Sequence, residues 1–184
     1  MKQYASDKIR NVTLLGHGGS GKTSLVEAIL FDKKLTNRLG SVDEGNTVSD
    51  YTREEIKRKF SIGTSLLPVE WAGGKINFLD TPGYFDFVGE TIGALSVSGG
   101  AVIVIDASSG IEVGTEKAWQ FVEKRHMPRI IFINKMDKEN INYLELVESL
   151  KDQFGTKIAP FVVPIGDGED FKGYVNVVDM VGRI

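Results

Sequence analysis

The stretch from Gly16 to Thr23 reads G-H-G-G-S-G-K-T, and it constrains the fold more than any other part of the 184-residue chain. It matches the phosphate-loop pattern G-x-x-x-x-G-K-[ST], which joins the end of a buried strand to the start of a helix. The apolar run Val12 to Leu15 precedes it, and the stretch Lys22 to Phe31 follows it with apolar residues at helical spacing. The motif therefore stands in the context that it requires.

Each part of this loop has a chemical role toward phosphate. Glycines allow successive backbone N–H groups to turn inward, and the following helix directs its positive end at the same charge. Lys22 is expected to reach the outer phosphates, and the Thr23 hydroxyl is a ligand for Mg²⁺. The alternative is a glycine-rich turn with an exposed lysine, and the pattern arises by chance in roughly one such chain in a hundred or fewer. The residues assigned to nucleotide binding here are Gly16, His17, Gly18, Gly19, Ser20, Gly21, Lys22, Thr23 and Ser24.

A second motif, Asp80-Thr-Pro-Gly83, directly follows the apolar stretch Ile76 to Leu79. In a sheet of this topology, that strand should end beside the phosphate loop. Asp80 is then placed to hold Mg²⁺ through a water, and the Gly83 N–H can approach a terminal phosphate because no side chain blocks it. Taken alone, D-T-P-G is also a good turn sequence.

A third motif, Asn134-Lys-Met-Asp137, follows the apolar strand that ends at Ile133. An aspartate that accepts from two guanine N–H groups rejects adenine, because adenine would leave the carboxylate without donors. The motif therefore predicts guanine recognition by Asn134, Lys135 and Asp137. A solvated helix start is the alternative for this stretch in isolation.

Short apolar runs alternate with amphipathic stretches along the chain, which is typical of an α/β fold. We predict a Ras-like phosphate-loop NTPase domain: a mostly parallel, six-stranded sheet with one antiparallel edge strand and helices on both faces. The strands are expected at 12–15, 65–71, 76–79, 101–106, 130–134 and 161–163, and the helices at 22–31, 85–97, 114–125 and 143–154. Residues 32–58 show little apolar periodicity, so we expect a structureless functional insert that is mobile without nucleotide.

Composition excludes several classes of partner. A net charge of −3 and a pI near 5.5 provide no field to attract duplex DNA or an anionic membrane, which favours a small anionic ligand held at a local site. The chain has no Cys, no signal-peptide core at its start and no apolar run long enough to span a bilayer. These features favour a cytoplasmic location.

With these three motifs in this order, the sequence resembles the translational GTPases, and most closely the nucleotide-binding domain of elongation factor G and its paralogues. The resemblance covers nearly the whole chain and extends to the stretches Asp86-Phe87, Asp106-Ala107, Pro164-Ile-Gly166 and Gly173 to Asp179. It implies a GTP-binding domain at 1–165 and the start of an insertion subdomain at 166–184. The family's base-clamping Ser-Ala motif has no equivalent here, so we expect an amino-terminal part of a larger protein.

Three parts of the site depart from the family pattern. In the family a histidine that orients the attacking water follows D-T-P-G, and here that residue is Tyr84. The family's first switch reads R-G-I-T, with a threonine on Mg²⁺; here Arg58-Lys-Phe-Ser61 keeps a hydroxyl, that of Ser61, but not the glycine or the isoleucine. The apolar pair that flanks the catalytic residue in the family becomes Gly18 and Phe60, so Gly18 would leave room for the larger ring of Tyr84.

The resemblance implies a Mg²⁺-dependent GTPase that converts GTP to GDP on the ribosome, slowly without it. Its catalytic residues would be Tyr84, Lys22 and Gly83, and its metal ligands Thr23, Ser61 and Asp80. A GTP/GDP switch with negligible hydrolysis is the alternative, which Tyr84 keeps open. A phosphate-loop kinase or ATPase is less consistent with Asn134 and Asp137. Translocation, recycling, rescue and antibiotic protection all use this domain.

Overall fold

The computed structural model of the chain describes residues 2–156 and 158–184, which divide into two compact units. The first unit holds the described residues through Val104 together with Val113–Phe132. The second holds Ile105–Glu112 and the described residues from Ile133 onward. Each unit is described by itself below.

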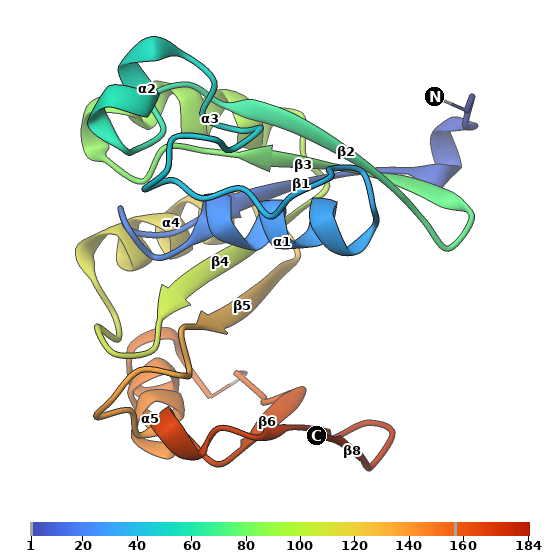
Figure 1. The fold of residues 1–184 in the computed structure, drawn as a ribbon. Helices are drawn as coiled ribbons and strands as arrows, with labels where there is room; N and C mark the ends of the chain where they lie inside the picture. Colours follow the sequence, from blue (N-terminus) through green and yellow to red (C-terminus); the bar gives the residue numbers. More distant parts are fainter. Residues whose placement is uncertain (1, 157) are drawn as a thin grey trace. The chain divides into compact units, whose positions relative to one another are not determined.

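The main sheet has five strands in the order β2-β3-β1-β4-β5, and a separate sheet has three in the order β6-β7-β8. Figure 1 shows the elements along the chain. Their bounds are β1 (Ile9–Leu15), α1 (Lys22–Asp32), α2 (Arg53–Arg58), β2 (Ser65–Trp71), β3 (Gly74–Asp80), α3 (Val88–Ser96), β4 (Gly100–Asp106), α4 (Val113–Lys124), β5 (Arg129–Asn134), α5 (Tyr143–Phe154), β6 (Val162–Ile165), β7 (Gly173–Asn176) and β8 (Val181–Arg183).

The strand register places the end of β3 beside the start of the phosphate loop. β1 pairs in parallel with β3, and Leu14 lies opposite Asp80. β2 and β3 form the antiparallel hairpin expected from the sequence, closed by Ala72 and Gly73, both of which have positive φ. Asp80 therefore lies next to the chain that enters the phosphate loop, as its position in the sequence predicts.

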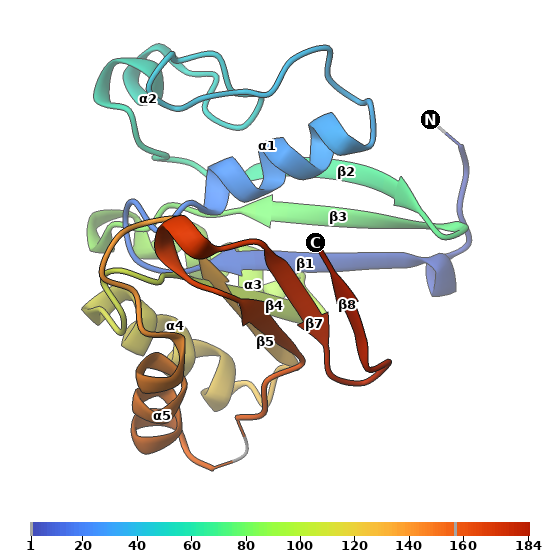
Figure 2. The same ribbon diagram turned by 60° about the horizontal axis from the view of Figure 1, so that its bottom comes forward.

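The first unit packs its core between α1 and the sheet. Figure 2 shows α1 and α3 on opposite faces of the β1–β3 region. The side chains buried between α1 and these strands come from apolar positions at helical spacing and at alternate strand positions. They are Leu14, Val26, Leu30, Leu67 and Val69.

The segment between α1 and β2 contains a helix where the sequence suggested a structureless insert. α2 begins with a capping box, in which the Thr52 hydroxyl accepts from the Glu55 N–H and the Glu55 carboxylate accepts from the Thr52 N–H. The helix ends at Lys59, which has a left-handed conformation with φ of 58°. The expectation of a segment without structure is therefore wrong for α2, whereas its mobility without nucleotide stays a prediction.

We expect Lys59→Gly to stabilise the protein by about 0.5–1 kcal/mol, because a left-handed backbone is unfavourable for a residue with a Cβ and not for glycine. Urea unfolding of the two proteins measures the difference. Lys59→Ala is the control, since it removes the side chain and keeps the Cβ. Equal stability of Lys59→Gly and Lys59→Ala would contradict the explanation.

The α/β fold with a mostly parallel sheet is confirmed, but the number of strands differs from the prediction. Five strands rather than six form the main sheet. The apolar stretch expected to supply the sixth instead becomes β6, which belongs to the second sheet and pairs antiparallel with β7, Ile165 lying opposite Gly173. A four-residue apolar run does not itself specify its partner strand. The domain boundary that the sequence predicts between residues 165 and 166 stays a prediction.

The expected helix 85–97 is divided in two, with a short 3-10 turn at Phe85–Phe87 before α3. Within the part of the chain that the structure describes, no helix combines the length and apolarity needed to cross a bilayer.

Candidate functional site

The phosphate loop lies between β1 and α1, as predicted. Gly16, Gly19 and Gly21 all have positive φ, and Gly21 is the N-cap residue just before α1. A Cβ on Gly16 would lie 2.3 Å from the Val104 carbonyl oxygen, so only glycine allows the loop to pass so close to β4. The backbone has the shape that allows N–H groups to surround a phosphate.

Lys22 and Gly83 meet across this loop. The Lys22 ammonium is buried and donates to the carbonyl oxygens of Gly16 and His17 at 3.2 and 2.9 Å. A Cβ on Gly83 would lie 2.6 Å from Lys22 Nζ and 2.7 Å from the Gly18 nitrogen. Any other residue at position 83 would therefore press on the lysine and on the loop. The two positions predicted to act on the outer phosphates are brought together.

Asp80 is the centre of a buried polar cluster. Its Oδ2 accepts from the Thr23 hydroxyl at 2.8 Å and from the Ser49 hydroxyl at 2.6 Å, and Thr23 Oγ1 lies 3.3 Å from Ser61 Oγ. Asp80 has no exposed surface, and its Oδ1 has no hydrogen-bond partner among the described residues. Burial raises the pKa of Asp80, whereas the two hydroxyls and the Lys22 charge lower it.

This cluster has the donors that Mg²⁺ prefers. Two hydroxyls, of Thr23 and Ser61, and the unoccupied Oδ1 of Asp80 are hard oxygen ligands close together. The described residues contain no group of three or more His, Cys, Asp or Glu that could hold a metal by themselves. Nucleotide phosphates and water would have to complete the coordination, which is how Mg²⁺ is held in phosphate-loop proteins.

Asp50 adds a further buried carboxyl group to this region. Burial raises the pKa of Asp50 to about 6, the Ser61 hydroxyl opposes this rise, and the charges of Asp80, Glu55 and Glu27 add to it. A carboxyl group whose pKa is raised on folding binds more protons in the folded state than in the unfolded state. It therefore lowers stability increasingly as the pH rises from about 4 to about 6.

Asp50→Asn should stabilise the nucleotide-free protein at pH 7 by about 1–3 kcal/mol, because it removes an ionised carboxylate from this buried site. It should also remove a decline in stability between about pH 4 and pH 6. Unfolding by denaturant across this pH range measures both effects. The exposed Asp43 provides the control Asp43→Asn. Loss of stability at pH 7 in Asp50→Asn would contradict this prediction.

Tyr84 lies over the phosphate loop between Gly18 and Phe60. A Cβ on Gly18 would lie 2.9 Å from Cζ of Tyr84, and the rings of Tyr84 and Phe60 have centroids 4.8 Å apart. The absence of a side chain at position 18 thus makes room for the tyrosine ring. The ring is 45% exposed.

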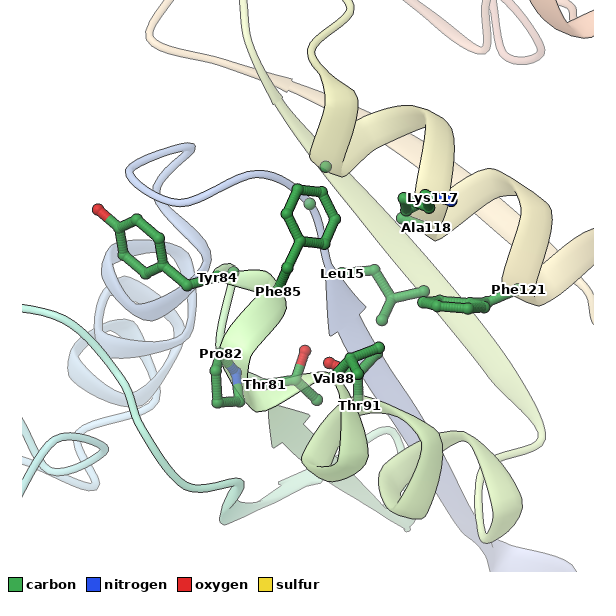
Figure 3. A pocket seen from close by; sticks show the side chains of 13 residues that line it. Leu15, Thr81, Pro82, Tyr84, Phe85, Val88, Thr91, Lys117, Ala118 and Phe121 are labelled. Carbon is green, nitrogen blue, oxygen red and sulfur yellow. The ribbon is translucent and has the colours of Figure 1, made fainter.

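A pocket adjoins this region, formed by residues of the phosphate loop, of the turn after β3, and of α3 and α4. Figure 3 shows Phe85 standing over the pocket, whereas the Tyr84 hydroxyl points away from it. Tyr84 thus lines the pocket with its ring, which contacts Phe60 and lies over the loop at Gly18.

The second unit contains the guanine motif at the end of β5. Lys135 and Lys138 both donate to Asp106 Oδ2, at 2.8 and 3.0 Å. Burial acts to raise the pKa of Asp106, but hydrogen bonds from Lys135, Ser108 and Lys138 outweigh it and hold the pKa below its usual value. The Asn134 carbonyl accepts from the Ala107 N–H at 2.8 Å, and the Asp137 side chain is exposed. These contacts shape the turn and leave the Asp137 carboxylate accessible.

Several contacts of the first unit shape the site although the sequence does not indicate them. Ser49 donates to Asp80, and His17 Nδ1 accepts from the Gly114 N–H at 3.3 Å. The Thr81 hydroxyl donates to the Leu14 carbonyl oxygen at 2.6 Å and so fixes the turn after β3. His17 and Thr81 lie within motifs, but these contacts of theirs have no signal in the sequence; Ser49 and Gly114 come from segments whose residue pattern does not indicate a ligand site.

Comparison with known proteins gives the following matches. The family model described as elongation factor Tu GTP binding domain matches residues 7–182. A mitochondrial ribosome-releasing factor 2 from Bos taurus is 42% identical over 93% of this chain, and an elongation factor G from Chlamydia trachomatis serovar D is 38% identical over 96%. A crystal structure of a Thermus thermophilus protein matches with a TM-score of 0.87 and 39% identity, covering 92% of this chain and 26% of that one. The chain spans 22% and 26% of the lengths of the two named relatives.

Proposed function

The chain belongs to the elongation factor Tu GTP binding domain family, and we propose that it binds GTP with Mg²⁺ and hydrolyses it to GDP and phosphate as part of a ribosome-associated translation factor. The observation that carries this proposal is the convergence of Thr23, Ser61 and Asp80 beside the phosphate loop. The names of the relatives, elongation factor G and ribosome-releasing factor 2, support a role on the ribosome.

The residues of the site have separate roles in this function. Lys22 would exchange the carbonyl oxygens of Gly16 and His17 for phosphate oxygens, which concentrates positive charge where negative charge develops. The Gly83 N–H would donate to the terminal phosphate, since its backbone already lies against Lys22 and Gly18. Thr23, Ser61 and Asp80 would hold Mg²⁺, which when bound neutralises phosphate charge. Asn134, Lys135 and Asp137 would select guanine.

Tyr84 is proposed to orient the attacking water through its hydroxyl. A phenol hydroxyl can donate or accept a hydrogen bond but is a poor proton acceptor. Phosphoryl transfer depends mainly on positioning and charge stabilisation, and a tyrosine is sufficient for positioning. The contacts with Phe60 and with the loop at Gly18 restrict the ring beside the phosphate site.

A second function is favoured by one observation, the 45% exposure of Tyr84. A hydroxyl that points into solvent would not order a water at the phosphate, and the protein would then act as a GTP/GDP switch with negligible hydrolysis of its own. Turnover of GTP by the protein with and without ribosomes separates the two functions. Equal affinities for GTP and ATP would instead indicate a phosphate-loop kinase or ATPase.

The names of the relatives also bear on the compartment. We propose a cytoplasmic location, as for a bacterial elongation factor G, and no role for a membrane or duplex DNA. The name of the mitochondrial relative makes the mitochondrial matrix the alternative. Imaging of the tagged protein in its native cell distinguishes the two.

A further inference from the structure

Glu27 is a buried carboxylate that the proposed function does not use. It lies on α1, is only 1% exposed, and its Oε1 accepts from the backbone N–H groups of Val48 and Ser49 at 2.7 and 3.2 Å. A buried carboxylate is retained only where donors compensate for the loss of water. Here the donors come from a turn more than twenty residues away in the sequence.

The position of Glu27 on α1 connects this turn to the magnesium-binding residues. Glu27 is four residues after Thr23, so the two side chains lie on the same face of the helix. Thr23 donates to Asp80 Oδ2, and the Ser49 hydroxyl donates to the same oxygen. Glu27 therefore fixes the backbone of the residue whose side chain contacts the Asp80 carboxylate.

The other carboxylate oxygen of Glu27 fits closely against a second part of the same segment. A Cβ on Gly40 would lie 2.2 Å from Glu27 Oε2 and 3.0 Å from the Thr47 Cα. Glycine at position 40 thus allows the chain to pass directly over the carboxylate. The segment meets α1 at both Gly40 and the turn of Val48 and Ser49, with Glu27 between them.

Apolar contacts do little to hold this turn. The side chains of Val48 and Tyr51 are exposed, and the buried residues between them, Ser49 and Asp50, are polar. Hydrogen bonds must therefore determine where the turn lies. The Ser49 carbonyl also accepts from the Ser65 hydroxyl at 2.6 Å, but this bond leaves the N–H groups of the turn to Glu27.

We propose that Glu27 is a positioning residue: it holds the turn Thr47–Asp50 on α1 and thereby sets the Ser49 hydroxyl on Asp80, in the geometry that the magnesium site requires. The link to magnesium rests on the proposed function, whereas the attachment of the turn to α1 does not. Removal of a residue that orients a metal-binding side chain typically lowers metal affinity by about 10–100-fold.

Amide hydrogen exchange of the nucleotide-free protein tests the attachment. Glu27→Ala should accelerate exchange at Val48 and Ser49 by about tenfold or more, because both N–H groups lose their acceptor. Glu27→Gln keeps a carbonyl oxygen and should restore most of the protection. Gly40→Ala should also accelerate exchange at these two amides while leaving the carboxylate in place, so the proposal remains testable if Glu27→Ala fails to fold.

Glu90→Ala is the matched control. Glu90 is an exposed glutamate that accepts the Thr64 N–H at 2.9 Å, at the other end of the same segment. Its removal should accelerate exchange at Thr64 and not at Val48 or Ser49. Wild-type exchange at Val48 and Ser49 in folded Glu27→Ala or folded Gly40→Ala would overturn the proposal.

The second measurement is the Mg²⁺ concentration that half-saturates GDP binding. We expect Glu27→Ala and Ser49→Ala each to raise it by about tenfold, and the double variant to raise it no further than either alone. A lowered unfolding midpoint with an unchanged Mg²⁺ requirement would show that Glu27 serves stability only, and would overturn the positioning role. Failure of the wild-type protein to bind GDP would refute the proposed function. The hydrogen-exchange result would still decide whether Glu27 attaches the turn Thr47–Asp50 to α1.

Discussion

Asp137→Asn should reduce the affinity for GTP about a hundredfold or more, because the guanine N–H groups lose a carboxylate that accepts both of them. The same change should increase the affinity for xanthosine triphosphate, whose ring offers a carbonyl to the new amide. The exposed position of Asp137 after β5 leaves its carboxylate free to meet a base. Calorimetric titration with GTP, xanthosine triphosphate and ATP measures the change.

Asp152→Asn provides the control for this experiment, since Asp152 is an exposed aspartate on α5. Its affinities should equal those of the wild-type protein. If Asp137→Asn bound GTP as tightly as the wild-type protein, guanine recognition would have to be assigned to other residues.

Tyr84→Phe should reduce ribosome-stimulated GTP hydrolysis by roughly ten- to a thousandfold and leave GTP affinity unchanged, which is the loss usual for a positioned catalytic group. The substitution removes the hydroxyl alone and preserves the ring contacts with Phe60 and with the loop at Gly18. Single-turnover hydrolysis on ribosomes, together with GTP titration, separates the effect on chemistry from the effect on binding.

Tyr51→Phe is the matched control, because Tyr51 is an exposed tyrosine in the neighbouring segment before α2. It should hydrolyse GTP at the wild-type rate. A wild-type rate for Tyr84→Phe as well would leave Tyr84 as a packing residue, and the water would then be oriented by Mg²⁺, by the backbone or by ribosomal groups.

The residues near the phosphate loop were predictable because short-range rules determine them. A glycine-rich loop between an apolar strand and a helix has few alternatives, and the short run of small residues Ala72-Gly73-Gly74 is too short for a crossover helix and permits only a hairpin, whose turn is Ala72 and Gly73. The order of the motifs along the chain then implied that Asp80 lies beside the loop, and the pairing of Leu14 with Asp80 agrees with it.

The contacts that depend on distant residues could not be predicted. Glu27 follows the helical pattern of a polar residue facing solvent, and nothing in the sequence indicates that Val48 and Ser49 donate to it. α2 has only six residues and is too short for a visible apolar period, although its capping box, Thr52 with Glu55, is a local signal that indicates its start.

The position of the Tyr84 ring was likewise predictable only in part, from nearby residues and not from distant ones. The sequence indicated that glycine at position 18 leaves space for a larger ring, and the structure places the ring over that glycine. Size alone could not establish that Phe60 would contact the ring from the other side, because that contact depends on the path of the chain after α2.

We propose that this chain uses its phosphate loop and Asn134-Lys-Met-Asp137 to bind and hydrolyse GTP. Turnover of GTP and of ATP by the wild-type protein, each with and without ribosomes, tests it most directly. We expect hydrolysis of GTP that ribosomes accelerate and no comparable hydrolysis of ATP. Equal turnover of the two nucleotides, or GTP hydrolysis that ribosomes leave unchanged at a negligible rate, would contradict it.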